Sequence, residues 1–239
     1  MPSLLVVDDE VDSCQNLADI FTDLGYRVDI AYDGTAALDK MRHARYDIAL
    51  LDLMMPGMDG VSLYHEMKRQ RPEIVAVLTT AYPNHPRAEA SLKTGVWRIV
   101  PKPVDLPGLL TLLIEAVNLP LVLLVDDDTD LCANLWDLFW ERGFRVNVAH
   151  DIRTAAELLR NDNFKVVLID LRLPDGDGAE VLRLVRQIES QARTVLITGH
   201  KADLDASLER FTETGPDAVC YKPFDVPELL GIVDRLSRS

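Results

Sequence analysis

Acidic side chains stand directly after two short apolar runs in the N-terminal half, and such runs are typical of buried strands. Asp8 and Asp9 follow the run that begins at Leu4, and Asp52 follows the run that begins at Ile48. The carboxyl ends of neighbouring strands in an open parallel sheet meet at one edge, so we expect these three carboxylates to lie together. Carboxylates packed this closely repel one another unless a cation joins them, and an all-oxygen site suits Mg²⁺ or Mn²⁺. The pattern therefore predicts a divalent-metal site.

Two further polar residues follow apolar runs in the same half. Thr80 offers a hydroxyl group, and Lys102 adds a positive charge after the run Ile99–Val100. With Asp52 as a carboxylate nucleophile and a bound metal ion, these groups are the parts needed to receive a phosphoryl group. The metal and the lysine would neutralise the phosphoryl oxygens, and the threonine would hydrogen-bond to one of them.

The whole pattern occurs twice in the 239 residues. The acidic positions and the threonine recur at an offset of 118 residues, and the lysine recurs at an offset of 120. The recurring residues are Asp126, Asp127, Asp170, Thr198 and Lys222. The repeat predicts two domains of ordinary size, residues 1–119 and 120–239. No Gly/Ser-rich linker separates them, so we expect the two domains to have a restricted orientation.

Each copy alternates apolar runs with segments of helical periodicity. In the first copy, the expected strands are Leu4–Val7, Val28–Ala31, Ile48–Leu51, Ile74–Thr79 and Ile99–Val100. The expected helices lie around Leu17–Leu24, at Thr35–Arg42, at Gly60–Lys68, after Pro86 and at Leu106–Val117. Strands and helices in this alternation indicate an α/β fold with a parallel sheet covered on both faces.

Composition and charge exclude several classes of function. The formal net charge of −14 argues against a nucleic-acid surface, which needs clustered Lys and Arg. No apolar run approaches the length of a membrane-spanning helix, about 20 residues, so we expect no membrane contact. The 3 cysteines form no disulfide framework, and reduced thiols are typical of a cytoplasmic protein.

Four motifs per copy give the chain a family resemblance. Each copy has an acidic pair, the motif D-x-x-x-P-x-x-D-G, a threonine followed by Ala or Gly, and a Lys-Pro pair. With these motifs in order over nearly its whole length, the chain resembles two response-regulator receiver domains of two-component signalling in tandem. The resemblance implies two flavodoxin-like, doubly wound (βα)5 domains, each with a five-stranded parallel sheet in the order 2-1-3-4-5.

The resemblance also implies a role for each motif residue. Asp52 and Asp170 would be the phosphoacceptors, Thr80 and Thr198 the switch hydroxyls, and Lys102 and Lys222 the contacts to the acyl phosphate. One Mg²⁺ (or Mn²⁺) per domain would be held by the carboxylates and one backbone carbonyl. These metal ligands are Asp8, Asp9, Asp52 and Met54 in the first domain, and Asp126, Asp127, Asp170 and Arg172 in the second. The Lys-Pro bonds before Pro103 and Pro223 would be cis.

The chain departs from the family pattern at several positions. Ile99 and Val219 stand where the family often has an aromatic switch residue, so a coupling between threonine and a ring is in doubt in both domains. Pro83 and Pro86 predict that the fourth helix of the first copy starts late, near Arg87. The matching segment of the second copy, GHKADLDASLERF, predicts a regular helix, so the output faces of the two domains should differ.

Residues that tune the lifetime of the acyl phosphate in the family also differ between the copies. The first copy has Met54 and Tyr82 at these positions, and the second has Arg172 and His200. Apolar cover over the first site and polar groups at the second would let the first site hold its phosphoryl group longer. We state this as a hypothesis.

Two residue types outside the motifs allow more than one interpretation. Cys14 and Cys132 are equivalent in the repeat; a paired redox role competes with simple packing as small residues, which is favoured. Trp136 and Trp140 lie one helical turn apart on a flank that the first copy keeps small or polar. Exposed tryptophans often mark an interface, with another domain or a partner, and local burial is the alternative.

The leading hypothesis is a tandem receiver that accepts phosphoryl groups from a histidine kinase or a histidine phosphotransfer protein and signals by protein contacts. A homodimer through the fourth helix, fifth strand and fifth helix is a further expectation. The chain could also be the receiver portion of a longer regulator with a diguanylate cyclase, DNA-binding or kinase module. A Mg²⁺-dependent phosphohydrolase is disfavoured, because that class places its two aspartates two residues apart, whereas Asp8 and Asp9 are adjacent. A third class is an unphosphorylated structural adaptor, but both sites are complete.

Overall fold

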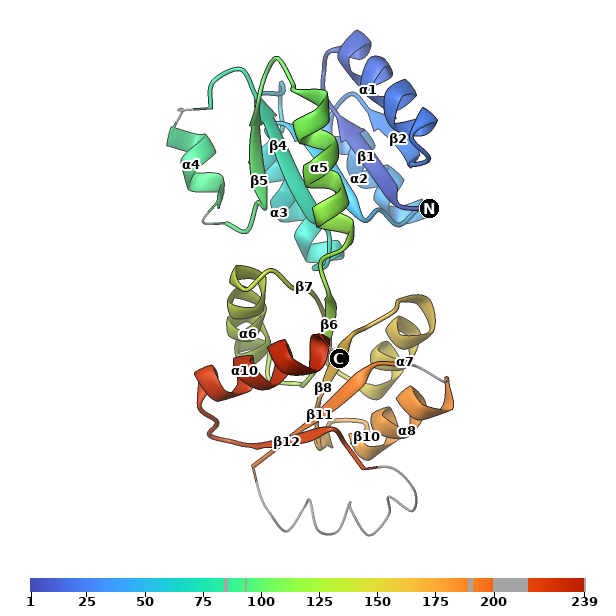
Figure 1. The fold of residues 1–239 in the computed structure, drawn as a ribbon, viewed down its shortest axis with the longest axis vertical. Helices are drawn as coiled ribbons and strands as arrows, with labels where there is room; N and C mark the ends of the chain where they lie inside the picture. Colours follow the sequence, from blue (N-terminus) through green and yellow to red (C-terminus); the bar gives the residue numbers. More distant parts are fainter. Residues whose placement is uncertain (84–85, 93, 189–190, 200–214, 239) are drawn as a thin grey trace. The chain divides into compact units, whose positions relative to one another are not determined.

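The computed structural model describes residues 1–83, 86–92, 94–188, 191–199 and 215–238. The chain divides into two compact units, Met1–Leu119 and Pro120–Ser239. Each unit is a parallel sheet flanked by helices (Figure 1). The predicted α/β fold class is therefore confirmed, and each unit is described on its own.

The first unit has one five-stranded parallel sheet in the order β2-β1-β3-β4-β5. Its strands are β1 Ser3–Val7, β2 Arg27–Ala31, β3 Ile48–Asp52, β4 Val75–Thr80 and β5 Arg98–Pro101. Its described helices are α1 Val11–Asp23, α2 Gly34–His43, α3 Gly60–Gln70, α4 Pro86–Leu92 and α5 Leu106–Val117. Every residue of β1, β3 and β4 is buried, which explains their continuous apolar sequences.

The helices of the first unit cover both faces of the sheet. Leu5, Leu51 and Leu78 lie on the face that packs against Ala37 of α2 and Leu63 of α3. Figure 1 shows α1 and α5 on the opposite face, where each buries an apolar stripe of its own. Aspartates at the N-caps of three helices fix where those helices begin, because each accepts a backbone N–H of the first turn. These caps are Asp33 for α2, Asp59 for α3 and Asp105 for α5.

The late start of the fourth helix agrees with the proline pattern to within one residue. Helix α4 begins at Pro86, not at Arg87, because proline is well suited to the first turn of a helix. The matching segment of the second unit, residues 200–214, lies outside the described residues, so the regular helix predicted there stays a prediction.

The second unit repeats the topology, with its main sheet in the order β7-β6-β8-β11-β12. The strands are β6 Leu121–Val125, β7 Arg145–Ala149, β8 Val166–Asp170, β11 Arg193–Thr198 and β12 Ala218–Tyr221. The described helices are α6 Thr129–Glu141, α7 Ile152–Asn161, α8 Ala179–Gln187 and α10 Val226–Ser237. A small antiparallel pair, β9 Arg172–Leu173 and β10 Gly176–Asp177, has no counterpart among the described residues of the first unit and was not expected from the sequence.

Both Lys-Pro bonds, Lys102–Pro103 and Lys222–Pro223, are cis, as the family resemblance implied. Asp128 caps α6 by accepting the backbone N–H groups of Asp130 and Leu131. Within the described part of the chain, no helix is long and apolar enough to span a bilayer.

Candidate functional site

Three carboxylates of the first unit come together where β1 and β3 end. Candidate ligand oxygens of Asp8, Asp9 and Asp52 lie within 4.8 Å of one another. Asp8 and Asp52 are only 3% and 6% exposed, whereas Asp9 is open to solvent. The cluster therefore has two buried carboxylates and one carboxylate that faces solvent.

Lys102 joins the two buried carboxylates. Its Nζ atom lies 2.7 Å from Oδ2 of Asp8 and 2.9 Å from Oδ1 of Asp52. Burial alone would lower the pKa of Lys102, but the two carboxylates outweigh it and raise the pKa, so the ammonium stays charged. Three carboxylates against one ammonium leave an excess of negative charge, and oxygen donors with that excess suit a divalent cation such as Mg²⁺.

Backbone N–H groups fix the other oxygen of each buried carboxylate. The N–H of Glu10 donates to Oδ1 of Asp8 at 3.0 Å, and that of Met54 donates to Oδ2 of Asp52 at 3.2 Å. Each carboxylate is thus held between the lysine and a loop amide. These contacts within the protein set the orientation of both carboxylates.

Thr80 ends β4 beside this cluster and is fully buried. Its Oγ1 accepts the N–H of Tyr82 at 3.0 Å, and its carbonyl accepts the N–H of Lys102 at 2.8 Å. The second bond couples the end of β4 to the end of β5. In the bond from the N–H of Tyr82 the Thr80 hydroxyl is the acceptor, so its own proton is available to a ligand oxygen.

The glycine of the D-x-x-x-P-x-x-D-G motif has a steric reason in both units. A Cβ atom on Gly60 would lie 2.4 Å from the carbonyl oxygen of Asp52, and one on Gly178 would lie even closer to that of Asp170. Helices α3 and α8 therefore begin directly against the backbone of the candidate nucleophile. No side chain fits at that point.

The second unit builds the same cluster from the equivalent residues. The carboxylates of Asp126, Asp127 and Asp170 converge within 4.8 Å, with Asp127 exposed and the other two buried. Nζ of Lys222 lies 2.7 Å from Asp126 and 2.5 Å from Asp170. Burial raises the pKa of Asp126 against the lowering effect of Lys222, so its carboxylate is costly to keep charged until a cation joins it.

The remaining predicted residues of the second site also gather at this edge. The N–H of Arg172 donates to Oδ1 of Asp170 at 2.9 Å, as Met54 does in the first unit. Thr198 is 1% exposed, and its carbonyl accepts the N–H of Lys222 at 2.7 Å. His200 lies outside the described residues.

The side chains named as lifetime-tuning residues do not form a closed apolar cover over the first site. Met54 is 48% exposed and Tyr82 is 66% exposed, so most of both side chains is in solvent. Arg172 is exposed as well. Their role in the lifetime of a phosphoryl group stays a prediction.

The two equivalent cysteines are packed inside their units. Burial, followed by the charge of the nearby buried aspartate, raises the pKa of Cys14 to about 11 and that of Cys132 to about 12. Their thiols donate to the carbonyls of Asp8 and Asp126 at 3.4 Å in both cases. Protonated and inaccessible thiols agree with the packing interpretation.

The expectation of two exposed tryptophans is wrong for Trp136. Its side chain is 4% exposed and belongs to the core under α6. Trp140 stacks on it with ring centroids 5.0 Å apart and is only partly buried. The physical reason is that the indole of Trp140 covers that of Trp136, whereas the equivalent position in the first unit holds the small Ala18. An interface role remains a prediction for Trp140 alone.

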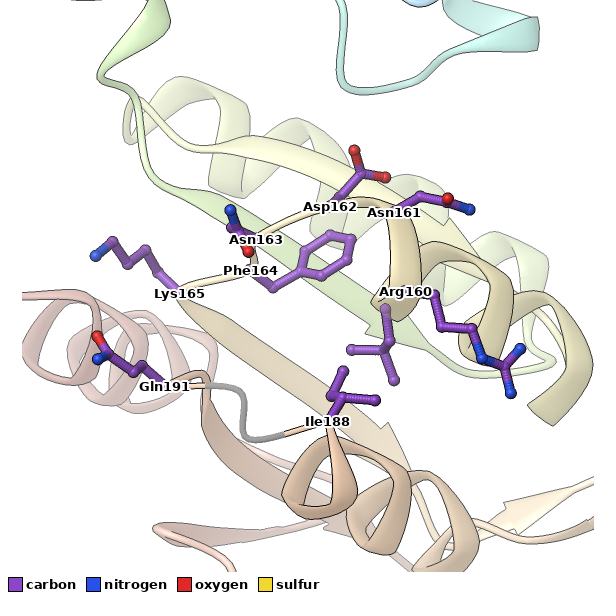
Figure 2. A pocket seen from close by; sticks show the side chains of 9 residues that line it. Arg160, Asn161, Asp162, Asn163, Phe164, Lys165, Ile188 and Gln191 are labelled. Atoms are coloured by element: carbon purple, nitrogen blue, oxygen red, sulfur yellow. The ribbon is translucent and has the colours of Figure 1, made fainter.

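A cavity of about 770 Å³ lies elsewhere in the second unit, away from the acidic cluster (Figure 2). Leu159, Phe164 and Ile188 form its apolar lining, and Figure 2 shows Arg160 and Lys165 directed away from Phe164 to opposite sides. Phe164 precedes β8, whereas Asp170 ends that strand, so the cavity is at the amino edge of the sheet. It takes no part in the chemistry of the carboxylates.

Comparisons with known proteins agree with this arrangement. A family model, the response regulator receiver domain, matches residues 4–114 and again residues 122–234. Together the two matches cover most of the chain, and each contains one acidic cluster with its lysine.

Similar proteins differ in how much of their own length matches this chain. A response regulator receiver protein of Anaeromyxobacter sp. strain Fw109-5 is 36% identical over 240 residues, which cover 100% of this chain and 97% of that protein. The transcriptional regulatory protein ZraR of Klebsiella oxytoca is 37% identical over 114 residues, which cover 48% of this chain and 26% of ZraR. Most of the ZraR sequence thus has no counterpart in the match.

Solved structures of a response regulator and of a receiver domain are also similar to parts of this chain. The response regulator TrrA from Thermotoga maritima, in complex with Mg²⁺-BeF, is 30% identical with a TM-score of 0.45, covering 48% of this chain and 99% of that one. The receiver domain of NtrX from Brucella abortus is 30% identical with a TM-score of 0.46, covering 48% of this chain and 97% of that one.

Proposed function

The chain belongs to the response regulator receiver family, and we propose that both of its domains, residues 1–119 and 120–239, accept phosphoryl groups, on Asp52 and Asp170. One observation supports this most strongly: a lysine and two buried carboxylates converge at the same sheet edge in both units. A purely structural ion pair would not need a third, solvent-facing carboxylate beside it in each unit.

In the proposed step a phosphoryl group moves from a nitrogen atom of the donor to a carboxylate oxygen of the acceptor. A carboxylate oxygen of Asp52 forms a bond to phosphorus while the P–N bond of a donor phosphohistidine breaks, and the donor imidazole takes up a proton from water. A Mg²⁺ ion held by Asp8, Asp9, Asp52 and the carbonyl of Met54 would supply positive charge for the phosphoryl oxygens.

The protein's own residues supply the remaining contacts. Lys102 already lies between Asp8 and Asp52, so its ammonium needs only a small shift to reach a phosphoryl oxygen. The buried hydroxyl of Thr80, which accepts in its bond from the N–H of Tyr82, would then donate its proton to the same group. Asp126, Asp127, Asp170, the Arg172 carbonyl, Thr198 and Lys222 have the matching roles in the second domain.

Receiver domains of response regulators interact with histidine kinases, and we propose a histidine kinase or a histidine phosphotransfer protein as the donor. The signal would pass on by protein contacts, including a homodimer through the surface of α4, β5 and α5, without direct contact to nucleic acid. We propose that the chain is a signalling protein and not an enzyme that turns over a substrate.

A second candidate, the receiver portion of a longer regulator, is favoured by one observation. ZraR matches over only 26% of its length, whereas the Anaeromyxobacter protein matches over 97%. Relatives therefore include a protein that matches over nearly its whole length and a longer protein of which only one part matches half of this chain. Isolation of the protein from its native cells, followed by intact mass measurement, distinguishes them: a mass near 26.8 kDa excludes an attached module.

Phosphoryl uptake is tested by intact mass after incubation with Mg²⁺ and a small acyl phosphate or phosphoramidate. We expect two added phosphoryl groups on the wild-type chain and one on either Asp52→Ala or Asp170→Ala. A wild-type chain that gains none, or a double variant that still gains two, would contradict the proposal.

The different neighbours of the two acceptors support a difference in lifetime. We propose that the first site holds its phosphoryl group longer. Of its two neighbouring side chains, Met54 is apolar and Tyr82 has only a phenol as its polar group, whereas Arg172 and His200 at the second site are both polar. Loss of label is compared between phosphorylated Asp170→Ala, which keeps the first site, and phosphorylated Asp52→Ala. Faster loss from the Asp170→Ala protein would exclude this idea.

A further inference from the structure

The two sites differ in how the loop beside the phosphoacceptor is held. In the second domain, Arg172–Leu173 pairs with Gly176–Asp177, so the loop is a two-residue hairpin around Pro174 and Asp175. In the first domain, the segment of equal length from Leu53 to Asp59 is fully described and contains no strand pair. The loop of the second site therefore has a hydrogen-bonded framework of its own.

The hairpin sets the direction of the Arg172 backbone. Leu173 and Gly176 flank the turn and form the hydrogen-bonded pair, so Arg172 and Asp177 form the next pair, which exchanges no backbone bonds. The N–H and C=O of such a residue both point away from the partner strand. The N–H of Arg172 indeed donates to Asp170, so its carbonyl is directed to the side of the acidic cluster as well.

Asp175, at the tip of the hairpin, fastens it to the start of α7. Both carboxylate oxygens of Asp175 lie 3.0 Å from the backbone N of Ile152, the first residue of that helix. The positive end of the α7 dipole favours a carboxylate at this place. Gly176 lies against the same residue, because a Cβ there would come within 2.8 Å of Cδ1 of Ile152.

The first domain has no such fastening at the equivalent position. Gly57 stands in place of Asp175; it has no side chain and has φ +78°, a conformation that favours glycine. Met58 packs on Gly34 at the start of α2, but that contact is made by a flexible side chain and not by a hydrogen bond to the helix.

From these contacts we propose that Asp175 is a positioning residue for the divalent cation of the second site, which makes this site the tighter of the two. The inference rests on the proposed function, because it takes the Arg172 carbonyl as a metal ligand. A carbonyl held in place before the cation arrives costs less conformational freedom on binding than one in an unpaired loop. We expect a difference of about three- to tenfold in dissociation constant, the usual effect of ordering one loop segment.

The test measures Mn²⁺ binding, by the electron paramagnetic resonance signal of the free ion, in the full chain with the first site disabled by Asp9→Asn and Asp52→Asn. In this background, Asp175→Gly, which copies Gly57, should weaken binding about three- to tenfold. Asp175→Asn keeps an acceptor oxygen without the charge and should stay within about twofold of the background. With the second site disabled instead, by Asp127→Asn and Asp170→Asn, the first site should bind more weakly than the second.

Each outcome decides a separate point. Unchanged binding by Asp175→Gly overturns the positioning role, and so does an Asp175→Asn variant as weak as Asp175→Gly, since the charge would then be the cause. A background chain that binds no Mn²⁺ at all contradicts the proposed function itself. Should Asp175→Gly fail to fold, as judged by circular dichroism, Asp175→Ala removes the acceptor without added backbone freedom and the same comparison applies.

Discussion

Trp97 and Asp217 occupy the same place in the two sheets, one residue before the last strand. In both, the backbone N–H donates to the carbonyl of the second residue of the neighbouring strand, at 2.9 Å to Ala76 and at 2.9 Å to Thr194. The side chains then do opposite things. Trp97 is 9% exposed, with the guanidinium of Arg98 4.8 Å from its ring centroid.

Asp217 instead collects polar partners. It accepts the N–H and the hydroxyl of Thr194 at 2.8 and 3.1 Å, and guanidinium groups of Arg193 and Arg186 at 3.0 and 3.3 Å. The comparison shows that one backbone bond of the fold can be reinforced either by apolar burial or by a charged network. Only the second kind depends on pH.

One other contact also differs between the domains while its place in the fold is kept. At the contact between the loop after the acceptor and the next helix, the first domain pairs Gly34 with Met58, and the second pairs Ile152 with Gly176. In each domain one of the two residues is glycine and the other has a large side chain. The large side chain belongs to the loop in the first domain (Met58) and to the helix in the second (Ile152). The packed volume is preserved although both residues differ.

The largest expected effect concerns a feature that both domains share. Gly178→Ala and Gly60→Ala would push a Cβ into the backbone of Asp170 and Asp52, and each should destabilise its domain by about 3 kcal/mol or more. Urea unfolding measures the loss. The control is Gly231→Ala, inside α10 with no heavy atom within 4 Å, which should stabilise by about 0.5–1 kcal/mol. A tolerated Gly178→Ala would show that the close approach is not required.

The exchanged packing pair gives the next largest effect. Gly176→Met should cost about 2 kcal/mol, because the new side chain meets Ile152, and adding Ile152→Gly should restore at least half of that loss. The free energies of unfolding of the two single variants and the double variant form a mutant cycle. Strictly additive changes would mean that the two positions are not coupled.

The Asp217 network should make the stability of the second domain depend on acid. Burial would raise the pKa of Asp217, but the bonds from Thr194, Arg193 and Arg186 outweigh it and lower the pKa. A lowered pKa gives stability that is present above the ordinary value, about 3.9, and is lost as pH falls through the lower folded value. Asp217→Asn should therefore cost about 1–3 kcal/mol at pH 7 and much less at strongly acidic pH.

Tryptophan fluorescence reports the unfolding of the second domain alone in a Trp97→Phe background. The two remaining tryptophans, Trp136 and Trp140, both lie in that domain. Urea unfolding of the background chain and of the Asp217→Asn variant is followed at each pH. An equal difference between them at neutral and acidic pH would contradict the charged network as the source of stability.

The smallest expected effect comes from a hydrogen bond present in one domain only. The hydroxyl of Tyr46 donates to Asp29 at 2.9 Å, whereas the equivalent residues of the second domain are Phe164 and Asn147. Nδ2 of Asn147 is buried with no partner among the described residues. Phe164→Tyr should stabilise the second domain by about 0.5–1 kcal/mol, and Tyr46→Phe should destabilise the first by about 1 kcal/mol. Thermal unfolding gives both signs, and two changes of the same sign would refute the pairing.

The sequence predicted those features that depend on local pattern or on strand ends. The strand and helix order and the convergence of Asp8, Asp52 and Lys102 follow from apolar runs that end in polar residues. Contacts across the fold could not be read in this way. Asp175 and Ile152 are 23 residues apart, and nothing local to either indicates that they meet.

The burial of Trp136 escaped prediction for a related reason. Helical spacing placed it on a flank, but the stacking of Trp140 on it moves the edge of the core outward. The Pro174-Asp175-Gly176 run, in contrast, is a turn signal that could have indicated the β9–β10 hairpin.

The identity of the phosphorylated residues tests the central claim most directly. The chain, phosphorylated with a small donor and Mg²⁺, is treated with borohydride, which reduces an aspartyl phosphate to homoserine, and its peptides are sequenced by mass spectrometry. We predict homoserine at positions 52 and 170 and at no other aspartate. Homoserine at Asp9 or Asp127, or at none of the aspartates of a chain that has gained phosphate, would contradict the account.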